Sequence, residues 1–393
     1  MLSSILGSEP KVHSAQTQAL VDGNTGFALD LYRQLRTIKG NLFFSPYSIS
    51  TCLAMAYAGA RGDTAKQMAR VFHFEGDQQQ LHSSFGELQR QLGEASQEKG
   101  IELSVANALW AQKEYAFLPA FLEIAKANYQ ANLKQADFSM EAEAARSEIN
   151  DWVAQKTREK IKDILPPGSL DAATRLVLAN AIYFKGVWAK PYDKNETSNQ
   201  PFFLSATRQV DVPLMKHIDD VRYAQNSDFQ AVELPYRSNE LSMVILLPRQ
   251  VDGYVRLEKQ LTPRLLSQTV GEMKQQKVEI FLPRFKLEST LNLISVLAKM
   301  GMPDAFGARA DFSGMDGSKN LYISGIFHKA WGEVNEEGTE AAAATALTFT
   351  LSAVRSPAAP PPVFRADRPF IFLIRDTRSG SLLFLGRFAD PSS

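Results

Sequence analysis

The spacing of hydrophobic and polar positions changes about halfway along the chain. In the first half, apolar residues recur every three or four positions, as in residues 27–35 and 145–160, which is typical of amphipathic helices. From about residue 174 they form short runs and alternations such as LSMVILLP and PFIFLIRD, which predict strands. Because helical segments precede the strands instead of alternating with them, the pattern predicts one α+β fold with large, mostly antiparallel sheets.

Two segments show where the first helices should begin. In NTGFALDLYRQL, Asn24 or Thr25 can cap a helix whose apolar residues follow at helical spacing. In FFSPYSISTCLAMAYAGARG, Ser45 stands at an N-cap position and Pro46 at the first helical position. We therefore expect a helix from about residue 25 and a buried helix from residue 46.

Composition and charge exclude some classes of partner. Of 393 residues, 45% are hydrophobic and 22% charged, as in a globular protein with a substantial core. The 43 basic and 43 acidic residues give a formal net charge of zero, so there is no electrostatic footprint for nucleic acid or an anionic membrane. No apolar run approaches the roughly 18 to 20 residues that span a bilayer. We expect a soluble protein that binds neither nucleic acid nor membrane.

The sequence contains no pattern of a metal site or of a known catalytic site. Cys52 is the only cysteine, and none of the five histidines has the spacing of a metal-ligand motif. Nucleophile-elbow, phosphate-loop and dinucleotide-binding patterns do not occur. We therefore expect no metal, no cofactor and no enzymatic activity. The N-terminus lacks a basic, apolar leader, so the protein is either cytoplasmic or secreted with its leader absent from this sequence.

Short polar residues interrupt three otherwise apolar segments. They are Ser45 and Ser48 at the start of the buried helix, Asn180 in LVLANAIYF and His328 in ISGIFHKAWGEV. Each can be a satisfied core residue, because a buried polar group without a partner costs a few kcal/mol. Four such positions are more than chance suggests, and we interpret them as a set.

The segment EEGTEAAAATALTFTLSAVRSPAAPPP, residues 336–362, suits helix, strand and loop equally well. A loop that becomes a central strand needs small or apolar side chains on one face and no prolines. The alternate positions 339, 341, 343, 345, 347, 349 and 351 are all threonine, alanine, leucine or phenylalanine, and Glu340 belongs to the other face. The prolines at 357 and 360–362 follow this stretch. A flexible alanine-rich linker is the alternative, but it has no reason to sort charges and prolines in this way.

Four pieces of sequence together resemble the serpin family. They are NLFFSPYSIS, NAIYFKGVW, FHKAWGEVNEEGTEAAAATA and ADRPFIFLIRDTRSGSLLFLGRFADP, in the order of the family. The resemblance covers essentially the whole chain from about residue 20 to Pro391. The resemblance implies a serpin fold, a single domain with three β-sheets and eight or nine helices. It also implies an N-terminal extension at 1–19, a serpin domain at 20–393 and an exposed reactive-centre loop at about 336–362.

The resemblance also assigns roles to individual residues. Ser45, Ser48, Asn180 and His328 match positions where the largest sheet of the family parts, and Trp188 matches the point where insertion begins. Phe370 to Leu373 would lie in the central hairpin. The hinge that enters the sheet would consist of Glu337, Gly338, Thr339, Glu340, Ala341, Ala342, Ala343, Ala344 and Thr345.

The family's spacing from Gly338 places the reactive bond between Ser352 and Ala353, with Leu351 as the preceding residue. Small and apolar residues here favour elastase-like, chymotrypsin-like or subtilisin-like proteases. Arg355 before Ser356 is a competing trypsin-like site, although cleavage there lengthens the insertable segment by three residues.

The resemblance implies a serine protease inhibitor that acts as a suicide substrate, through loop cleavage, acyl-enzyme trapping and strand insertion. A cysteine protease is a less favoured target. The alternative is a non-inhibitory serpin-fold carrier, chaperone or storage protein, which the proline-free, small-residue hinge disfavours.

We expect a monomer. Activation by heparin is not expected, because the helix at about 82–100 mixes Arg90 and Lys99 with three glutamates and has no basic stripe.

Overall fold

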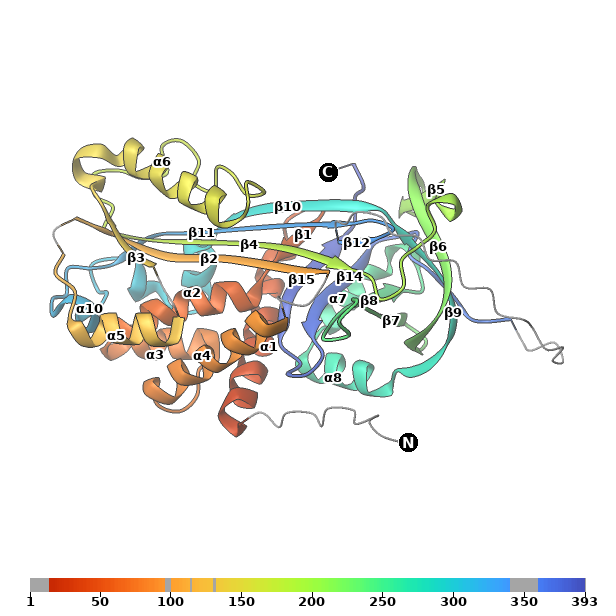
Figure 1. The fold of residues 1–393 in the computed structure, drawn as a ribbon, viewed down its shortest axis with the longest axis horizontal. Coiled ribbons are helices and arrows are strands. Elements are labelled where there is room, and N and C mark those ends of the chain that lie inside the picture. The colour runs from red at the N-terminus through yellow and green to blue at the C-terminus, as the bar shows by residue number, and fades with distance from the viewer. Residues whose placement is uncertain (1–13, 96–99, 114, 130–131, 340–359, 393) are drawn as a thin grey trace, which may run out of the picture.

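The computed structural model describes residues 14–95, 100–113, 115–129, 132–339 and 360–392. In this part of the chain, ten α-helices and fifteen strands form one body (Figure 1). A six-stranded sheet runs along the molecule between helix α6 on one face and helices α1 to α5 on the other, and a nine-stranded sheet lies at one end.

Capping decides where the first two helices begin. Pro46–Gly59 (α2) starts as predicted, with Ser45 as its N-cap and Pro46 in the first turn. The start predicted at Asn24 or Thr25 is wrong, because Ala15–Leu35 (α1) begins ten residues earlier, where the Ser14 side chain accepts a hydrogen bond from the N–H of Thr17. The remaining helices are Gly62–Phe72 (α3), Gln78–Ala95 (α4), Pro119–Tyr129 (α5), Phe138–Lys156 (α6), Tyr254–Gln260 (α7), Pro263–Glu272 (α8), Ile294–Met300 (α9) and Ser313–Asp316 (α10).

The six-stranded sheet has the order β10-β11-β4-β2-β3, and β12 pairs with one end of β4. Its two central strands, β11 and β4, run parallel, with His328 opposite Asn180 in the register. Their neighbours β10 and β2 pair with them antiparallel. The strands are Ile101–Gln112 (β2), Asn132–Ala136 (β3), Leu176–Val187 (β4), Phe285–Asn292 (β10), Ile323–Val334 (β11) and Gly338–Thr339 (β12).

The nine-stranded sheet is built around a hairpin near the C-terminus. Phe370–Asp376 (β14) and Leu382–Phe388 (β15) pair antiparallel, and all but one residue of the two strands are buried. The hairpin position predicted for Phe370 to Leu373 is therefore confirmed. The other strands are Leu42–Phe44 (β1), Ser198–Ser205 (β5), Arg208–Gln225 (β6), Phe229–Pro235 (β7), Leu241–Pro248 (β8), Lys274–Pro283 (β9) and Val363–Arg365 (β13).

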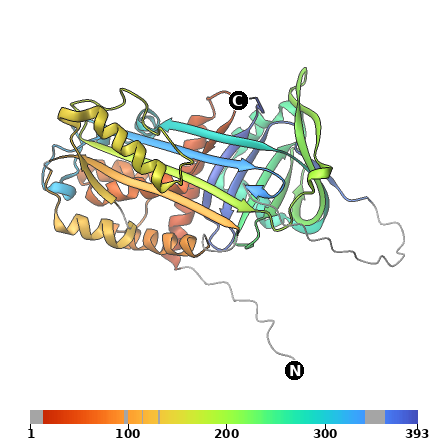
Figure 2. The same cartoon turned by 45° about the horizontal axis from the view of Figure 1, so that its top comes forward.

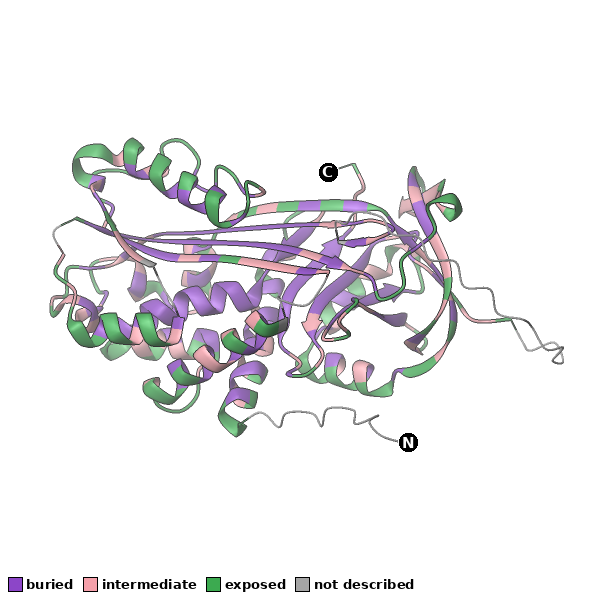
Figure 3. Ribbon diagram, in the orientation of Figure 1, coloured by how far each residue is buried: buried purple, intermediate pink, exposed green. Residues whose placement is uncertain are grey.

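Helix α6 covers the outer face of the six-stranded sheet. Beneath it the strands present small side chains, among them Ala106, Ala108, Ala179 and Ala181, against the larger apolar side chains of the helix. The opposite face of the sheet packs on α2, every residue of which is buried (Figure 3). The sheet is thus enclosed on both faces along much of its length.

The α+β serpin fold predicted from the sequence is confirmed, and two counts differ in detail. Hydrogen bonding joins two of the three expected sheets into one, because the long strand β6 pairs with β5 and β9 and also, at its far end, with β7. The described part of the chain has ten helices instead of eight or nine, since short ones such as the four-residue α10 are included. The boundary expected between residues 19 and 20 falls inside α1.

Candidate functional site

The chain that leaves β11 turns back and enters the six-stranded sheet. The N–H of Asn335 donates to the carbonyl of Gly338 over 2.7 Å, and the N–H of Gly338 donates back over 3.1 Å. Gly338 and Thr339 then pair antiparallel with Val187 and Gly186 at the end of β4. A strand that continued from Thr339 along β4 would therefore lie between β4 and β11.

Most of the predicted loop lies outside the described residues. These positions include the hinge from Glu340 to Thr345, as well as Leu351, Ser352, Ala353, Arg355 and Ser356. Their roles remain predictions. The sheet that receives β12 is also not the one with the most strands, because hydrogen bonding merges the other two sheets of the fold.

Gly338 is required by the close packing of two backbones. Its φ of 142° is rarely adopted by L-residues with side chains, and a Cβ at this position would lie 2.0 Å from the carbonyl oxygen of Gly186. It would also lie 2.6 Å from Cα of Val187. We call β12 together with Gly186, Val187 and Trp188 the hinge seat.

Trp188 forms the floor of the hinge seat. Its backbone N–H donates to the carbonyl of Glu337 over 2.9 Å, and its indole Nε1–H donates to the carbonyl of Asn335 over 3.0 Å. The indole is buried and stacks on Tyr236, with ring centroids 4.7 Å apart. The turn from β11 into β12 is therefore fixed by one rigid aromatic side chain.

Two acidic residues anchor the same turn to the segment that follows β4. The buried carboxylate of Glu336 accepts a hydrogen bond from Oγ1 of Thr197 over 2.8 Å and pairs with Arg284. Burial raises the pKa of Glu336, but these two hydrogen bonds outweigh it, so the pKa lies below its ordinary value. Glu337 pairs with Lys194 over 2.7 Å, which raises the pKa of that lysine.

The sequence did not predict the partners of these acids. Thr197, Lys194 and Arg284 lie on segments far from Glu336 in the chain, and each is an ordinary surface residue by type. Only the pairing of distant strands brings them together.

Deeper in the same sheet, the predicted polar residues come together in one cluster. Nδ2 of Asn180 lies 3.0 Å from the carbonyl oxygen of Ser48, 2.5 Å from its Oγ, and against Oδ1 of Asn107. Nδ1 of His328 bonds to Oδ1 of Asn180, and the N–H of Ser45 donates to Nε2 of His328 over 3.1 Å. These five residues, named here the central polar cluster, join β11, β4 and β2 to the start of α2.

The hydrogen bonds fix the protonation state of His328. Because Nε2 accepts from a backbone N–H, Nδ1 must carry the proton that is donated to Asn180. The ring is fully buried, and burial lowers its pKa to about 3. The imidazole is therefore neutral near pH 7, and a second proton would cost it the bond to Ser45.

Asn107 belongs to the cluster but was not predicted. A signal was available, since Asn107 stands in Ala-Asn-Ala within β2 and Asn180 stands in Ala-Asn-Ala within β4. The two tripeptides pair directly in the antiparallel register, with Asn107 opposite Asn180. Small flanking residues on both strands leave room for the two amides to meet.

The arrangement can accept a strand but contains no sign of a metal centre. Among the described residues, no group of three or more His, Cys, Asp or Glu side chains is placed to hold a metal ion. The central strands pair directly from Ile323 to Gly332 of β11, so the sheet is closed below the hinge seat. Opening it would break this pairing and the bond between His328 and Asn180.

The described chain is thus one α+β body in which β12 is seated at the end of a closed parallel strand pair. The sequence model of the family described as Serpin (serine protease inhibitor) matches residues 22–391. The chain therefore belongs to the serpin family.

Similar proteins span the whole chain. Human Serpin B3 is 38% identical over 95% of this chain and 100% of its own length. Human leukocyte elastase inhibitor is 42% identical, again over 95% of this chain and 100% of its own. The crystal structure of uncleaved ovalbumin superposes with a TM-score of 0.86 at 32% identity, covering 95% of this chain and 100% of ovalbumin.

No helix in the described part of the chain combines the length and the apolar character that crossing a bilayer requires.

Proposed function

We propose that the protein inhibits a serine protease by acting as a suicide substrate. The observation that carries the proposal is the hinge seat, where Gly338 and Thr339 already pair with the end of β4. A non-inhibitory carrier or storage protein needs no such entry point. The sequence after Thr339 continues with small residues suited to a buried strand face.

The first step is attack on the loop. The hydroxyl of the protease's catalytic serine adds to the carbonyl carbon of Ser352, the peptide bond to Ala353 breaks, and the new amine of Ala353 takes up a proton and leaves. Ser352 then remains as an ester on the protease. The assignment of the reactive bond to Ser352–Ala353 rests on the family's spacing from Gly338. The bond between Arg355 and Ser356 is the competing site.

The second step is insertion of the hinge along β4. The fourteen residues from Thr339 to Ser352, at about 3.3 Å each, carry the tethered protease on the order of 45 Å. The ester is trapped if this movement distorts the protease before water reaches the ester, because small positioning errors slow catalysis strongly. The inhibitor is consumed in the process.

The closed sheet must be less stable than the inserted one. About a dozen new ladder hydrogen bonds at roughly 1 kcal/mol each rival the 5 to 15 kcal/mol stability of an ordinary domain. Strand addition of this kind is a known behaviour of serpins. The uncleaved protein is therefore metastable, and cleavage within the loop raises its thermal midpoint.

The small and apolar residues around Ser352 support an elastase-like, chymotrypsin-like or subtilisin-like target. The similarity to leukocyte elastase inhibitors supports the same choice. A trypsin-like target would use Arg355 instead.

The test is incubation with neutrophil elastase, chymotrypsin, subtilisin and trypsin, followed by denaturing gel electrophoresis. We expect a complex that survives boiling in detergent, together with some cleaved inhibitor. Mass spectrometry of the released C-terminal peptide identifies the bond. Reversible inhibition without a covalent complex would exclude the mechanism, and a peptide that begins at Ser356 would move the reactive bond.

A further inference from the structure

One edge of the six-stranded sheet is only partly covered. Strand β2 pairs with β4 from Ile101 to Ala111, but β3 pairs with β2 only from Ala108 to Gln112. Within the described chain, residues 101–107 therefore have no strand partner on their outer side (Figure 2). Along such an edge, every second residue directs its backbone N–H and C=O away from the sheet.

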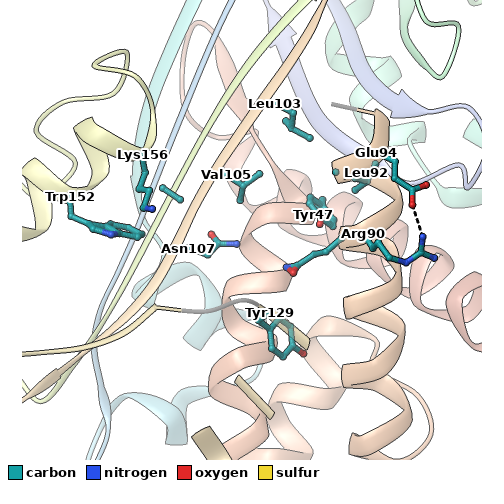
Figure 4. A pocket seen from close by; sticks show the side chains of 13 residues that line it. Tyr47, Arg90, Leu92, Glu94, Leu103, Val105, Asn107, Tyr129, Trp152 and Lys156 are labelled. Carbon is teal, nitrogen blue, oxygen red and sulfur yellow. Dashed lines mark hydrogen bonds and ion pairs between the residues drawn. The ribbon is translucent and has the colours of Figure 1, made fainter. Parts of the chain in front are cut away.

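A pocket of about 530 Å³ surrounds this edge. Leu103, Val105 and Asn107 of β2 lie opposite Arg90 and Leu92 of α4, whereas Trp152 and Lys156 come from α6 (Figure 4). The side chains of Leu103 and Val105 face α4, and Ala106 belongs to the apolar layer beneath α6. The pocket thus reaches both faces of the strand.

Two polar groups in the pocket lack partners among the described residues. Oδ1 of Asn107 takes part in the central polar cluster, but nothing accepts a hydrogen bond from its Nδ2. The exposed ammonium of Lys156 forms no ion pair, in contrast to Arg90, which pairs with Glu94 over 2.6 Å. Val105 adds an apolar side chain that is 37% exposed.

We propose that residues 101–107 bind an extended peptide segment of a partner protein, which adds to β2 as a further strand. An extended backbone is the one ligand that satisfies a row of alternating N–H and C=O groups. Its alternate side chains enter the two faces of the pocket, apolar ones toward Leu103, Val105 and Leu92 and an acidic one toward Lys156. The site does not depend on protease trapping.

The probe is the fluorescein-labelled peptide VELEV, whose valines and leucine share one face and whose glutamates share the other. We expect saturable binding by fluorescence anisotropy. The same peptide N-methylated at its three central residues cannot complete the ladder and should not bind. In hydrogen exchange, the outward-facing amides of residues 101–107 should exchange at least tenfold more slowly when the peptide is bound.

The matched protein variants are Lys156→Gln and Lys277→Gln, the latter on an exposed lysine of β9 in the other sheet. Lys156→Gln removes an exposed charge partner of the peptide and should weaken binding about two- to fivefold. Lys277→Gln should bind the peptide with the parental affinity. Four results would each overturn the proposal: no saturable binding, equal binding of the N-methylated peptide, equal affinities of the two variants, or no added protection at 101–107. Self-association of the free protein through this edge, seen by sedimentation, would assign the edge to a second copy instead.

Discussion

The two sheets of this protein are held together by different chemistry. The centre of the six-stranded sheet contains the central polar cluster, in which four polar side chains and the backbone N–H of Ser45 are joined by hydrogen bonds. The centre of the nine-stranded sheet is aromatic, and Phe384 of the hairpin stacks on Phe43 with ring centroids 5.1 Å apart and planes 6° apart. Both rings and four of the five cluster residues are buried, whereas Asn107 is half-buried.

The difference shows which sheet can change. Aromatic packing loses its stabilisation as soon as rings separate, because dispersion and burial depend on close contact. A hydrogen-bonded cluster between strands can exchange partners, since an incoming strand supplies new donors and acceptors. In the proposed mechanism, the polar sheet is therefore the one that accepts the hinge, and the aromatic sheet is the fixed support.

The largest expected effect on the six-stranded sheet comes from a substitution at Thr339. Thr339→Arg would require a cation to enter the opening sheet, at a cost of several kcal/mol, so insertion should slow. We expect cleavage at the same bond with release of the product, which turns the inhibitor into a substrate. Measured stoichiometry of inhibition should rise steeply. Glu340→Arg, at a position predicted to face solvent, should trap nearly as well as the parent. Equal trapping by both variants would refute the predicted alternation of buried and solvent-facing hinge residues.

The aromatic hairpin should show the next largest effect, and on stability alone. Phe384→Ala removes a fully buried ring and should lower the free energy of unfolding by about 3 to 5 kcal/mol. Because the hairpin does not take part in insertion, the thermal midpoints of the uncleaved and loop-cleaved forms should both fall. A fall confined to one form would mean that the nine-stranded sheet also changes on insertion.

The central polar cluster should respond to acid through His328. Its pKa is about 3 in the folded protein and about 6.5 in the unfolded chain, so its contribution is complete above pH 6.5 and is lost as pH falls toward 3. His328→Gln can keep the hydrogen bonds without titrating. Its stability should fall less with acid, by up to about 1.4 kcal/mol per pH unit. Parallel pH profiles of parent and variant would show that the histidine is not neutral in the cluster.

The smallest effect should come from the solvent-facing ion pair at the hinge seat. Lys194 is exposed, and such pairs add little to stability. Lys194→Gln should leave the thermal midpoint within experimental scatter and the trapping stoichiometry unchanged. The contrasting variant Thr197→Val removes a hydrogen bond to the buried carboxylate of Glu336 and should have a larger effect on both. A larger effect of Lys194→Gln than of Thr197→Val would mean that the ion pair of Glu337, and not the hydrogen bond to Glu336, holds the turn in place.

The sequence predicted the fold class, the α2 start and four members of the central polar cluster, because these depend on local patterns and on short polar residues in apolar runs. It did not predict the start of α1, since Ser14 gives a weaker pattern than the apolar stripe that follows. It also missed Asn107, whose Ala-Asn-Ala pattern gains meaning once β2 and β4 are paired, and Arg284 and Thr197, which meet Glu336 only in the folded chain. Long-range pairing is what a local pattern cannot encode.

The seating of Gly338 and Thr339 on β4 also bears on the speed of insertion. Bringing the first residues of a free segment to a sheet costs closure entropy before any ladder bond repays it. Here two residues are already in register, so insertion is elongation from a formed nucleus. Each later residue adds its bonds next to an ordered neighbour, as in the growth of a zipper. In the proposed mechanism, the insertion that competes with deacylation therefore starts without a search step, and its rate is set by how fast β4 and β11 separate.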